Sequence, residues 1–270
     1  MKNIIEIIYE DEHLIAINKP DGVSVTKDRT GKADILELLA KQMEHAEKLR
    51  LIHRLDKGTS GIMLLAKTLE AQSLFSSGFE KRLFKKTYLA LVSGYVSSPT
   101  GRIKAPIARS LRDVKQMCIS AKRGKEAITD FRLLAEFGIV SLVAAMPVTG
   151  RTHQIRVHFA NRNMPLAIDP VYGGKKPIML SDYKAGYGLS RGKKENPLIE
   201  RLTLHAYQLE LPKTELTEPL TLVAKPEKKF AAAIKMLTKH NPNGPEAFLD
   251  QQDFEDIISG TPLKTVDRVP

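Results

Sequence analysis

The spacing of apolar residues changes repeatedly along this chain, and this feature limits its fold more than any other. Residues 33–47 and 68–83 place apolar side chains three or four positions apart, as amphipathic helices do. Residues 140–148 instead alternate apolar and smaller side chains, as a strand buried on one face does. Because the period switches in this way, the pattern predicts strands and helices mixed along the chain and argues against an all-helical protein.

Strands are predicted in groups, with helices between the groups. Polar turns join neighbouring strands into two hairpins, one at Glu10-Asp11-Glu12 and one at Gly138. The predicted strands are residues 4–8, 14–18, 87–96, 114–120, 127–135, 140–148, 202–211 and 218–224, and further helices begin at Thr152 and span 228–238. This order predicts an α+β fold with a central mixed, largely antiparallel sheet flanked by helices and loops.

A chain of 270 residues is long enough for one large domain or two modest ones. We expect one main domain within residues 1–240. Residues 173–198 combine Gly, Lys, Pro and Asn without a clear period, and we predict a long surface insertion there. Residues 241–270 bear prolines and an acidic cluster. This tail is expected either to pack as an appendage or to stay mobile.

The charge balance favours a polyanionic partner. Lys and Arg number 42 against 31 Asp and Glu, which gives a net charge of +11. Residues 101–125 carry eight Lys or Arg against Asp113 alone, and residues 173–194 carry six against Asp182. Such runs are usually solvated faces, and a polyanion-binding surface is the second interpretation.

Cysteine usage and apolar runs restrict the compartment. Cys118 is the single cysteine, so an intramolecular disulfide and a cysteine-based zinc site are both excluded. The first residues acquire acidic side chains and build no signal-type apolar region, and no apolar run reaches the roughly 18 residues that span a bilayer. We therefore expect a cytoplasmic protein without a membrane anchor.

One carboxylate stands among cationic residues in the segment LIHRLDKGTSG, residues 51–61. Asp56 is flanked by His53, Arg54 and Lys57, and it lacks the neighbouring carboxylates of a metal site. Nearby positive charge favours the ionised form, which suits a nucleophile better than a general acid. Taken alone, the segment is more typical of a solvated surface salt bridge, and an anionic nucleophile is the alternative.

Two further segments carry candidate residues. In residues 149–158, Thr152 is a candidate helix N-cap and Arg156 falls in the first turns of that helix, whose free N–H groups suit a phosphate. His153 and His158 are five positions apart, so they point away from each other and are expected to cap or pack. Tyr88 follows two lysines in a strand, where a core role is the common one and base stacking is the alternative.

Five segments, taken together, resemble the motifs of one known family. They are Asn18-Lys19-Pro20-Asp21-Gly22, His53-Arg54-Leu55-Asp56 with Thr59-Ser60-Gly61, Lys86-Thr87-Tyr88, Gly150-Arg151-Thr152-His153-Gln154-Ile155-Arg156-Val157-His158, and Asp169-Pro170-Val171-Tyr172-Gly173. In this order they are similar to the motifs of the RluA-type family of RNA pseudouridine synthases, over residues 7–240. Many members carry a small RNA-binding domain before the first motif, whereas only a few residues precede it here, so we expect no separate N-terminal RNA-binding domain. The insertion at 173–198 is longer than the usual connection of the family.

The resemblance implies an isomerase that converts uridine to pseudouridine in ribosomal or transfer RNA. It implies that Asp56 is the nucleophile, that Arg156 pairs with it and that Tyr88 stacks on the target base. Arg54 is then expected to hold the duplex open or to engage phosphate while the nucleotide is flipped out. The reaction needs no metal or cofactor, and a monomer is expected. Attack on the sugar, attack on the ring and glycal formation all stay open, and a non-catalytic RNA-binding factor is the rival function.

Overall fold

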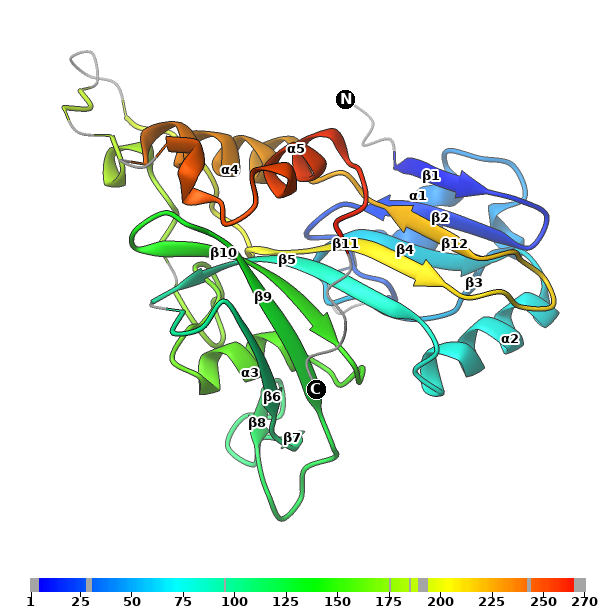
Figure 1. Cartoon of the computed structure of the whole chain (residues 1–270). Helices are drawn as coiled ribbons and strands as arrows, with labels where there is room; N and C mark the ends of the chain where they lie inside the picture. Colours follow the sequence, from blue (N-terminus) through cyan, green and yellow to red (C-terminus); the bar gives the residue numbers. More distant parts are fainter. Residues whose placement is uncertain are drawn as a thin grey trace. The chain divides into compact units, whose positions relative to one another are not determined.

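The computed structural model shows the chain as two compact units. The first is Met1–Tyr88 with His205–Lys225, and the second is Leu89–Leu204 with Pro226–Pro270. Two strands, β5 (Lys85–Ser93) and β11 (Leu204–Leu211), contribute residues to both units (Figure 1). The structure describes residues 5–27, 31–94, 96–174, 176–184, 186–188, 194–241 and 244–264.

The first unit is built on a mixed sheet. Its strands follow the order β1 (Glu6–Glu10), β2 (Leu14–Lys19), β4 (Ser60–Ala66) and β11, with β3 (Arg50–Leu51) also paired to β4 and β12 (Leu220–Val223) to β11. The β2 strand is antiparallel to both β1 and β4, whereas β11 is parallel to β4. This arrangement confirms the predicted N-terminal hairpin and the mixed character of the sheet.

The central strands of this unit are buried along their whole length. Every residue of β2 and of β4 is buried, and their apolar side chains form one core with α1 (Ile35–Ala40) and α2 (Leu69–Glu80). Strands covered on both faces appear in the sequence as continuous apolar runs rather than as an alternation. Ile62-Met63-Leu64-Leu65-Ala66 is such a run.

The helix predicted at residues 33–47 is shorter in the structure. It begins at a capping box, in which Asp34 accepts from the Glu37 N–H and Glu37 accepts from the Asp34 N–H. It ends at Ala40, and the nearby Gln42 amide bonds both backbone groups of Ile5 at 2.7 Å. A short 3₁₀ helix (Ala46–Lys48) follows instead of further α-helix.

The second unit contains an antiparallel sheet and a separate hairpin. The sheet includes β10 (Val140–Pro147), β9 (Ile128–Glu136) and β6 (Thr100–Lys104), and the hairpin pairs β7 (Ile107–Arg109) with β8 (Met117–Ile119). Gly138, with a φ of 87°, forms the turn between β9 and β10, which confirms the second predicted hairpin. In the described part of this unit, three α-helices accompany these strands: α3 (Gln154–Asn161), α4 (Lys228–His240) and α5 (Gln251–Ser259).

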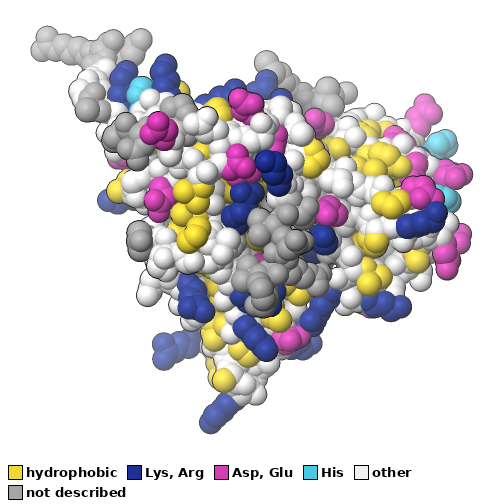
Figure 2. All heavy atoms as spheres, viewed as in Figure 1, with side chains coloured by type: hydrophobic (Ala, Val, Ile, Leu, Met, Phe, Trp, Pro, Cys, Tyr) yellow, Lys and Arg dark blue, Asp and Glu magenta, His cyan; other side chains and the backbone are white. Residues whose placement is uncertain are grey.

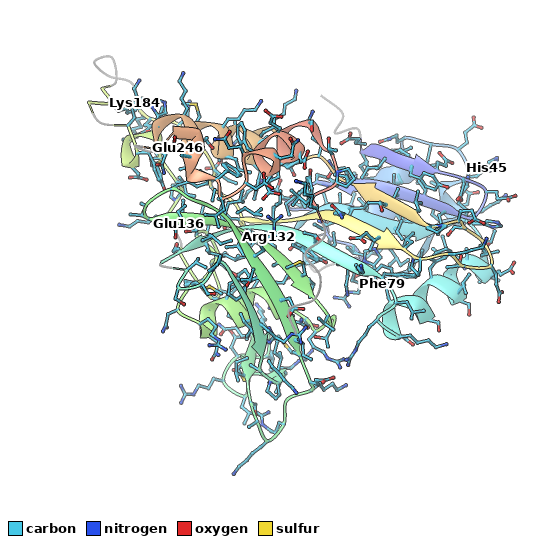
Figure 3. The ribbon with its side chains drawn as sticks, in the orientation of Figure 1. His45, Phe79, Arg132, Glu136, Lys184 and Glu246 are labelled. Carbon is cyan, nitrogen blue, oxygen red and sulfur yellow. The ribbon has the colours of Figure 1, made fainter. Side chains whose placement is uncertain are left out.

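The C-terminal residues pack on β9 within the second unit. Arg132 of β9, labelled in Figure 3, donates from Nη1 and Nη2 to the two carboxylate oxygens of Asp253 on α5, at 2.6 and 3.0 Å. Asp253 is buried, and the Leu249 N–H donates to the Leu134 carbonyl at 2.9 Å. Residues 244–264 are therefore packed, and their separation from a 1–240 domain stays a prediction.

The predicted insertion at residues 173–198 is described only in part, since Lys175, Arg191 and Lys193 lie outside the described residues. Within the described part, the Ile178 N–H donates to the Ile199 carbonyl at 2.9 Å, and both side chains are buried. In the part of the chain that the structure describes, no helix is both long and apolar enough to cross a membrane.

Candidate functional site

The loop between β3 and β4 presents Asp56 at the start of a buried strand. Asp56 is half-buried, whereas Arg54 and Lys57 on either side of it are exposed. The Thr59 N–H donates to the Asp56 carbonyl oxygen at 3.0 Å and closes a turn immediately before β4. The side chain therefore projects from a turn whose end is fixed by the sheet.

A buried ammonium group ties this loop to the end of β2. Lys19 is fully buried, and its Nζ donates to the carbonyl oxygens of Pro20 at 2.9 Å, Val23 at 2.8 Å and Lys57 at 3.3 Å. Because a buried charge must be satisfied by polar partners, these carbonyls have to converge on one point. The chain after β2 and the chain after Asp56 are thereby held together.

Gly61 fixes where β4 begins against β11. Its φ is 108°, and a Cβ built there would lie 2.1 Å from the carbonyl oxygen of Ala206, its partner in the parallel pairing. Gly61 thus lies inside the strand and permits a close backbone approach. Beside it, the Ser60 hydroxyl contacts His205 Nδ1 at 2.9 Å, and His205 Nε2 contacts the Ala224 carbonyl at 2.8 Å.

His53 is not one of the cations around Asp56. Its Nε2 accepts the Leu64 N–H at 3.0 Å, and its ring stacks on Phe79 of α2 with centroids 4.2 Å apart. Figure 3 labels Phe79. Burial, with the nearby charge of Lys86, lowers the pKa of His53 to about 3. The ring is neutral at physiological pH, so the positive charge expected at this position is absent.

Tyr88 lies within electrostatic reach of Asp56. Burial raises the pKa of the Tyr88 phenol, and the negative charge of Asp56 raises it further. Tyr88 is half-buried against the core of the first unit. Lys86, two positions earlier on β5, has its pKa lowered to about 8 by burial and by Arg82. The structure therefore brings a carboxylate and a protonated phenol into one region of the first unit.

Arg156, in the second unit, makes an ion pair that the sequence did not indicate. It lies in the first turn of α3 and is buried, and its Nε and Nη2 donate to the two oxygens of Asp169 at 2.7 and 2.8 Å. Burial opposes ionisation of Asp169, but Arg156 and two backbone N–H groups hold its pKa below the usual value. The expected role of Arg156 toward Asp56 stays a prediction.

The helix start predicted at Thr152 is wrong by two residues. The α3 helix begins at Gln154, and His153 takes the cap position with a φ of 55°. The Gln154 side chain supplies the local bonds: its Oε1 accepts from the Arg151 N–H at 3.0 Å and from the Thr149 hydroxyl at 2.6 Å. The segment is thus fixed by a side chain inside the helix rather than by a threonine cap.

Residues 13–161, which contain Asp56, Tyr88 and Arg156, match the sequence profile of the family described as RNA pseudouridylate synthase. The chain belongs to this family. This membership confirms the resemblance to the pseudouridine synthases inferred from the ordered motifs.

Several pseudouridine synthases are similar to the chain. Ribosomal large subunit pseudouridine synthase D of Borreliella burgdorferi is 37% identical over 195 residues, covering 67% of this chain and 60% of that protein. Ribosomal large subunit pseudouridine synthase C of Vibrio cholerae serotype O1 is 36% identical over 204 residues, covering 76% and 60%. The chain thus spans about 60% of the length of these curated relatives.

Solved pseudouridine synthase structures share the fold. The structure of human RNA pseudouridylate synthase domain containing 1 matches with a TM-score of 0.64 at 27% identity, and covers 84% of this chain and 85% of that chain. The corresponding human domain containing 4 matches with a TM-score of 0.62 at 26% identity, and covers 86% and 92%. These likenesses confirm the predicted α+β class.

The two histidines of the segment 150–158 pack, as expected. His158 is fully buried, with Nδ1 2.9 Å from the Thr129 hydroxyl and Nε2 3.0 Å from the Ala105 carbonyl oxygen, and burial lowers its pKa. His153 Nδ1 lies 2.8 Å from the Tyr172 hydroxyl. Among the residues that the structure describes, no group of three or more His, Cys, Asp or Glu is placed to hold a metal ion.

Cations gather around the β7–β8 hairpin of the second unit. Figure 2 shows Lys and Arg side chains over the region where Figure 1 has β6, β7 and β8. Arg102 is half-buried and paired with Asp130, and the other cations of residues 101–125 are exposed. The exposed ones are Lys104, Arg109, Arg112, Lys115, Lys122, Arg123 and Lys125.

His53 predicts a specific acid sensitivity of the fold. The unfolded chain protonates this residue below about pH 6.5, whereas the folded protein resists protonation down to about pH 3. The neutral His53 therefore costs the folded state no stability above about pH 6.5, and the free energy of unfolding falls as the pH decreases below that value. Between pH 7.5 and pH 5, wild type should lose about 2 kcal/mol more unfolding free energy than His53→Gln, as measured by urea titration.

The matched control is His45→Gln, because His45 belongs to the same unit and is exposed. It should leave the difference between the two pH values as in wild type. A His53→Gln protein with the pH dependence of wild type would contradict the neutral assignment of His53.

Proposed function

We propose that this protein isomerises uridine to pseudouridine within RNA, with Asp56 as the nucleophile. Family membership supports the reaction, and the observation that carries the assignment is the place of Asp56 in a turn that closes directly before the buried strand β4, in the unit that also holds Tyr88. The carboxylate stands in the loop directly before β4; Lys19 binds this loop through the Lys57 carbonyl, and Gly61 fixes the start of the strand. A rigid strand that positions a loop residue is how catalytic side chains are commonly held.

The chemistry needs one nucleophile and one exchange of bonds within a nucleotide. The bond from ribose C1′ to uracil N1 breaks, the base turns, and C1′ bonds to C5, which then loses its proton while N1 gains one. Asp56 begins this by attacking the sugar, by attacking the ring or by assisting glycal formation, and the three routes stay open. Because no electron acceptor or group donor takes part, we propose that the reaction uses no cofactor or metal.

Tyr88 is proposed as the surface on which the target base stacks. Its raised pKa keeps the phenol protonated at neutral pH, so in the resting protein it can donate a hydrogen bond and does not act as a base. An aromatic face accepts any base, and stacking contributes about 1–3 kcal/mol per base in single-stranded complexes. Tyr88 would therefore hold the base while it turns beside the carboxylate.

Two arginines are proposed to complete the site. Arg156 would orient Asp56 through a charge-assisted hydrogen bond, with its guanidinium already fixed by Asp169. Arg54 is exposed beside Asp56, and it would hold the gap left by the flipped nucleotide or engage a backbone phosphate.

The proposed substrate is structured RNA. The similar proteins from Borreliella burgdorferi and Vibrio cholerae are named for the large ribosomal subunit, so ribosomal RNA is the first candidate and transfer RNA the second. The exposed cations of residues 101–125 would bind its phosphates. We further propose that the protein acts in the cytoplasm, as a monomer, through one catalytic domain within residues 1–240.

Loss of the carboxylate should abolish catalysis. With RNA that carries tritium on the uracil carbon that becomes bonded to ribose, wild type should release label, and Asp56→Ala and Asp56→Asn should release it at least about 10³-fold more slowly. The control Glu12→Gln removes an exposed carboxylate in the same unit and should behave as wild type. Release that persists in Asp56→Ala contradicts the nucleophile, and no release by wild type from total cellular RNA favours a non-catalytic RNA-binding factor.

Neutralising part of the basic run should weaken RNA binding in a salt-dependent way. For the triple variant Lys122→Gln, Arg123→Gln and Lys125→Gln, the slope of log affinity against log salt should fall by about 0.7–0.9 for each phosphate that the variant no longer binds. The control Lys41→Gln, Lys48→Gln and Arg50→Gln removes the same number and type of exposed cations from the first unit, and should keep the slope. Filter binding at several salt concentrations measures the slope for both triple variants. An unchanged slope in the first triple variant would show that these cations are solvated and do not bind RNA phosphates.

A further inference from the structure

Tyr172 joins three segments of the second unit through one hydroxyl group. The Met117 N–H of β8 donates to the Tyr172 oxygen at 2.7 Å. His153 Nδ1, at the start of α3, lies 2.8 Å from the same oxygen. The hydroxyl therefore links the β7–β8 hairpin to the residue that precedes the helix carrying Arg156.

The same residue supports Arg156 through both its ring and its backbone. The Arg156 guanidinium carbon lies 5.0 Å from the centroid of the Tyr172 ring, within the range of a cation–π contact. The Tyr172 N–H also donates to Asp169 Oδ1 at 3.2 Å, and this carboxylate holds the guanidinium. The rigid Tyr172 side chain thus bonds the hairpin through its hydroxyl and contacts the Arg156 guanidinium through its ring face.

The loop of the β7–β8 hairpin exposes side chains of the kinds that bind RNA. Its loop exposes Arg112 and Lys115, and it also exposes two apolar side chains, Leu111 at 81% and Val114 at 69%. Basic side chains mixed with exposed apolar ones suit a polyanion that also offers base faces. This loop leads directly into β8, whose first residue, Met117, donates its N–H to the Tyr172 hydroxyl.

Apolar packing around Tyr172 also joins the β7–β8 hairpin to α3. Met117 and Ile119 of β8 and Tyr172 pack against a small buried cluster that includes Val157 of α3. A shift of β8 therefore requires either that the Tyr172 hydroxyl loses the Met117 N–H or that the ring tilts with the strand. A tilt of the ring moves the surface on which the Arg156 guanidinium rests.

We propose that Tyr172 is a positioning residue that couples the β7–β8 hairpin to Arg156, so that RNA held at the hairpin sets the orientation of the guanidinium. The inference rests on the proposed function, since it gives Arg156 a task at the reacting centre. The coupling runs through the hydroxyl, whereas the ring packs and supports the charge. Replacing tyrosine by phenylalanine separates these two contributions.

The coupling is measured without RNA or activity. Asp113 organises the hairpin turn, accepting from the Lys115 N–H at 2.9 Å and from the Gln116 side chain at 3.1 Å, so Asp113→Ala perturbs the hairpin away from Tyr172. The NMR signal of the Arg156 Nε–H group should shift on this change in wild type, and the shift should fall by at least about half in a Tyr172→Phe background. The control background is Tyr183→Phe, because the Tyr183 hydroxyl is buried without a hydrogen-bond partner among the described residues.

Equal shifts in all backgrounds, or no shift in wild type, would overturn the proposal. Activity gives a second readout: at saturating RNA, Tyr172→Phe should lower the rate of tritium release about tenfold while KM changes by less than about threefold, and Tyr183→Phe should change neither. A Tyr172→Phe rate equal to that of wild type contradicts the coupling. If wild type releases no tritium, the proposed function fails, and the NMR shifts still decide whether Tyr172 couples the hairpin to Arg156.

Discussion

The buried ammonium group of Lys19 is the constraint on which the candidate site depends. Removing a charge from water costs several kcal/mol unless polar partners replace the water, and here backbone carbonyls of Pro20, Val23 and Lys57 do so. These carbonyls belong to two loops that are far apart in the sequence. The loop that carries Asp56 can therefore not move away from the end of β2 without exposing an unsatisfied charge, and the register that pairs Lys19 with Gly61 fixes both loops at the start of β4.

The electrostatic character of the site follows from which groups are charged. The low pKa of His53 makes its ring a neutral hydrogen-bond acceptor, and the raised pKa of Tyr88 keeps its phenol protonated. The carboxylate of Asp56 is thus accompanied by a neutral aromatic surface and by exposed Arg54 and Lys57. An arrangement of this kind suits an anionic nucleophile facing a polyanionic substrate, with positive charge left for the substrate to engage.

The sequence predicted the elements and residues whose signals are local. Period-two alternation and the turn signal of Gly138 predicted the β9–β10 hairpin, and the ordered motifs pointed to Asp56, Tyr88 and Arg156. It did not indicate short strands such as β6 and β7, because a strand of a few residues is stabilised by its partner rather than by its own pattern. The partners Lys19 and Asp169 were also missed as interacting groups, since ion pairs and carbonyl contacts depend on tertiary packing. Asp169 and Tyr172 carried a usable signal, as both stand in the fifth motif, to which no chemical role was assigned.

The central claim is that a rigid framework holds the Asp56 carboxylate in one position for reaction. Asp56→Glu tests it most directly, because the variant keeps the charge and moves it by one methylene. A misplacement of about 1 Å can cost about 10²-fold in rate, so the variant should release tritium from labelled RNA at least about 10²-fold more slowly than wild type, with RNA affinity unchanged within about threefold. An Asp56→Glu rate within about threefold of wild type would contradict the account, because a carboxylate that works from either position is not held by its framework.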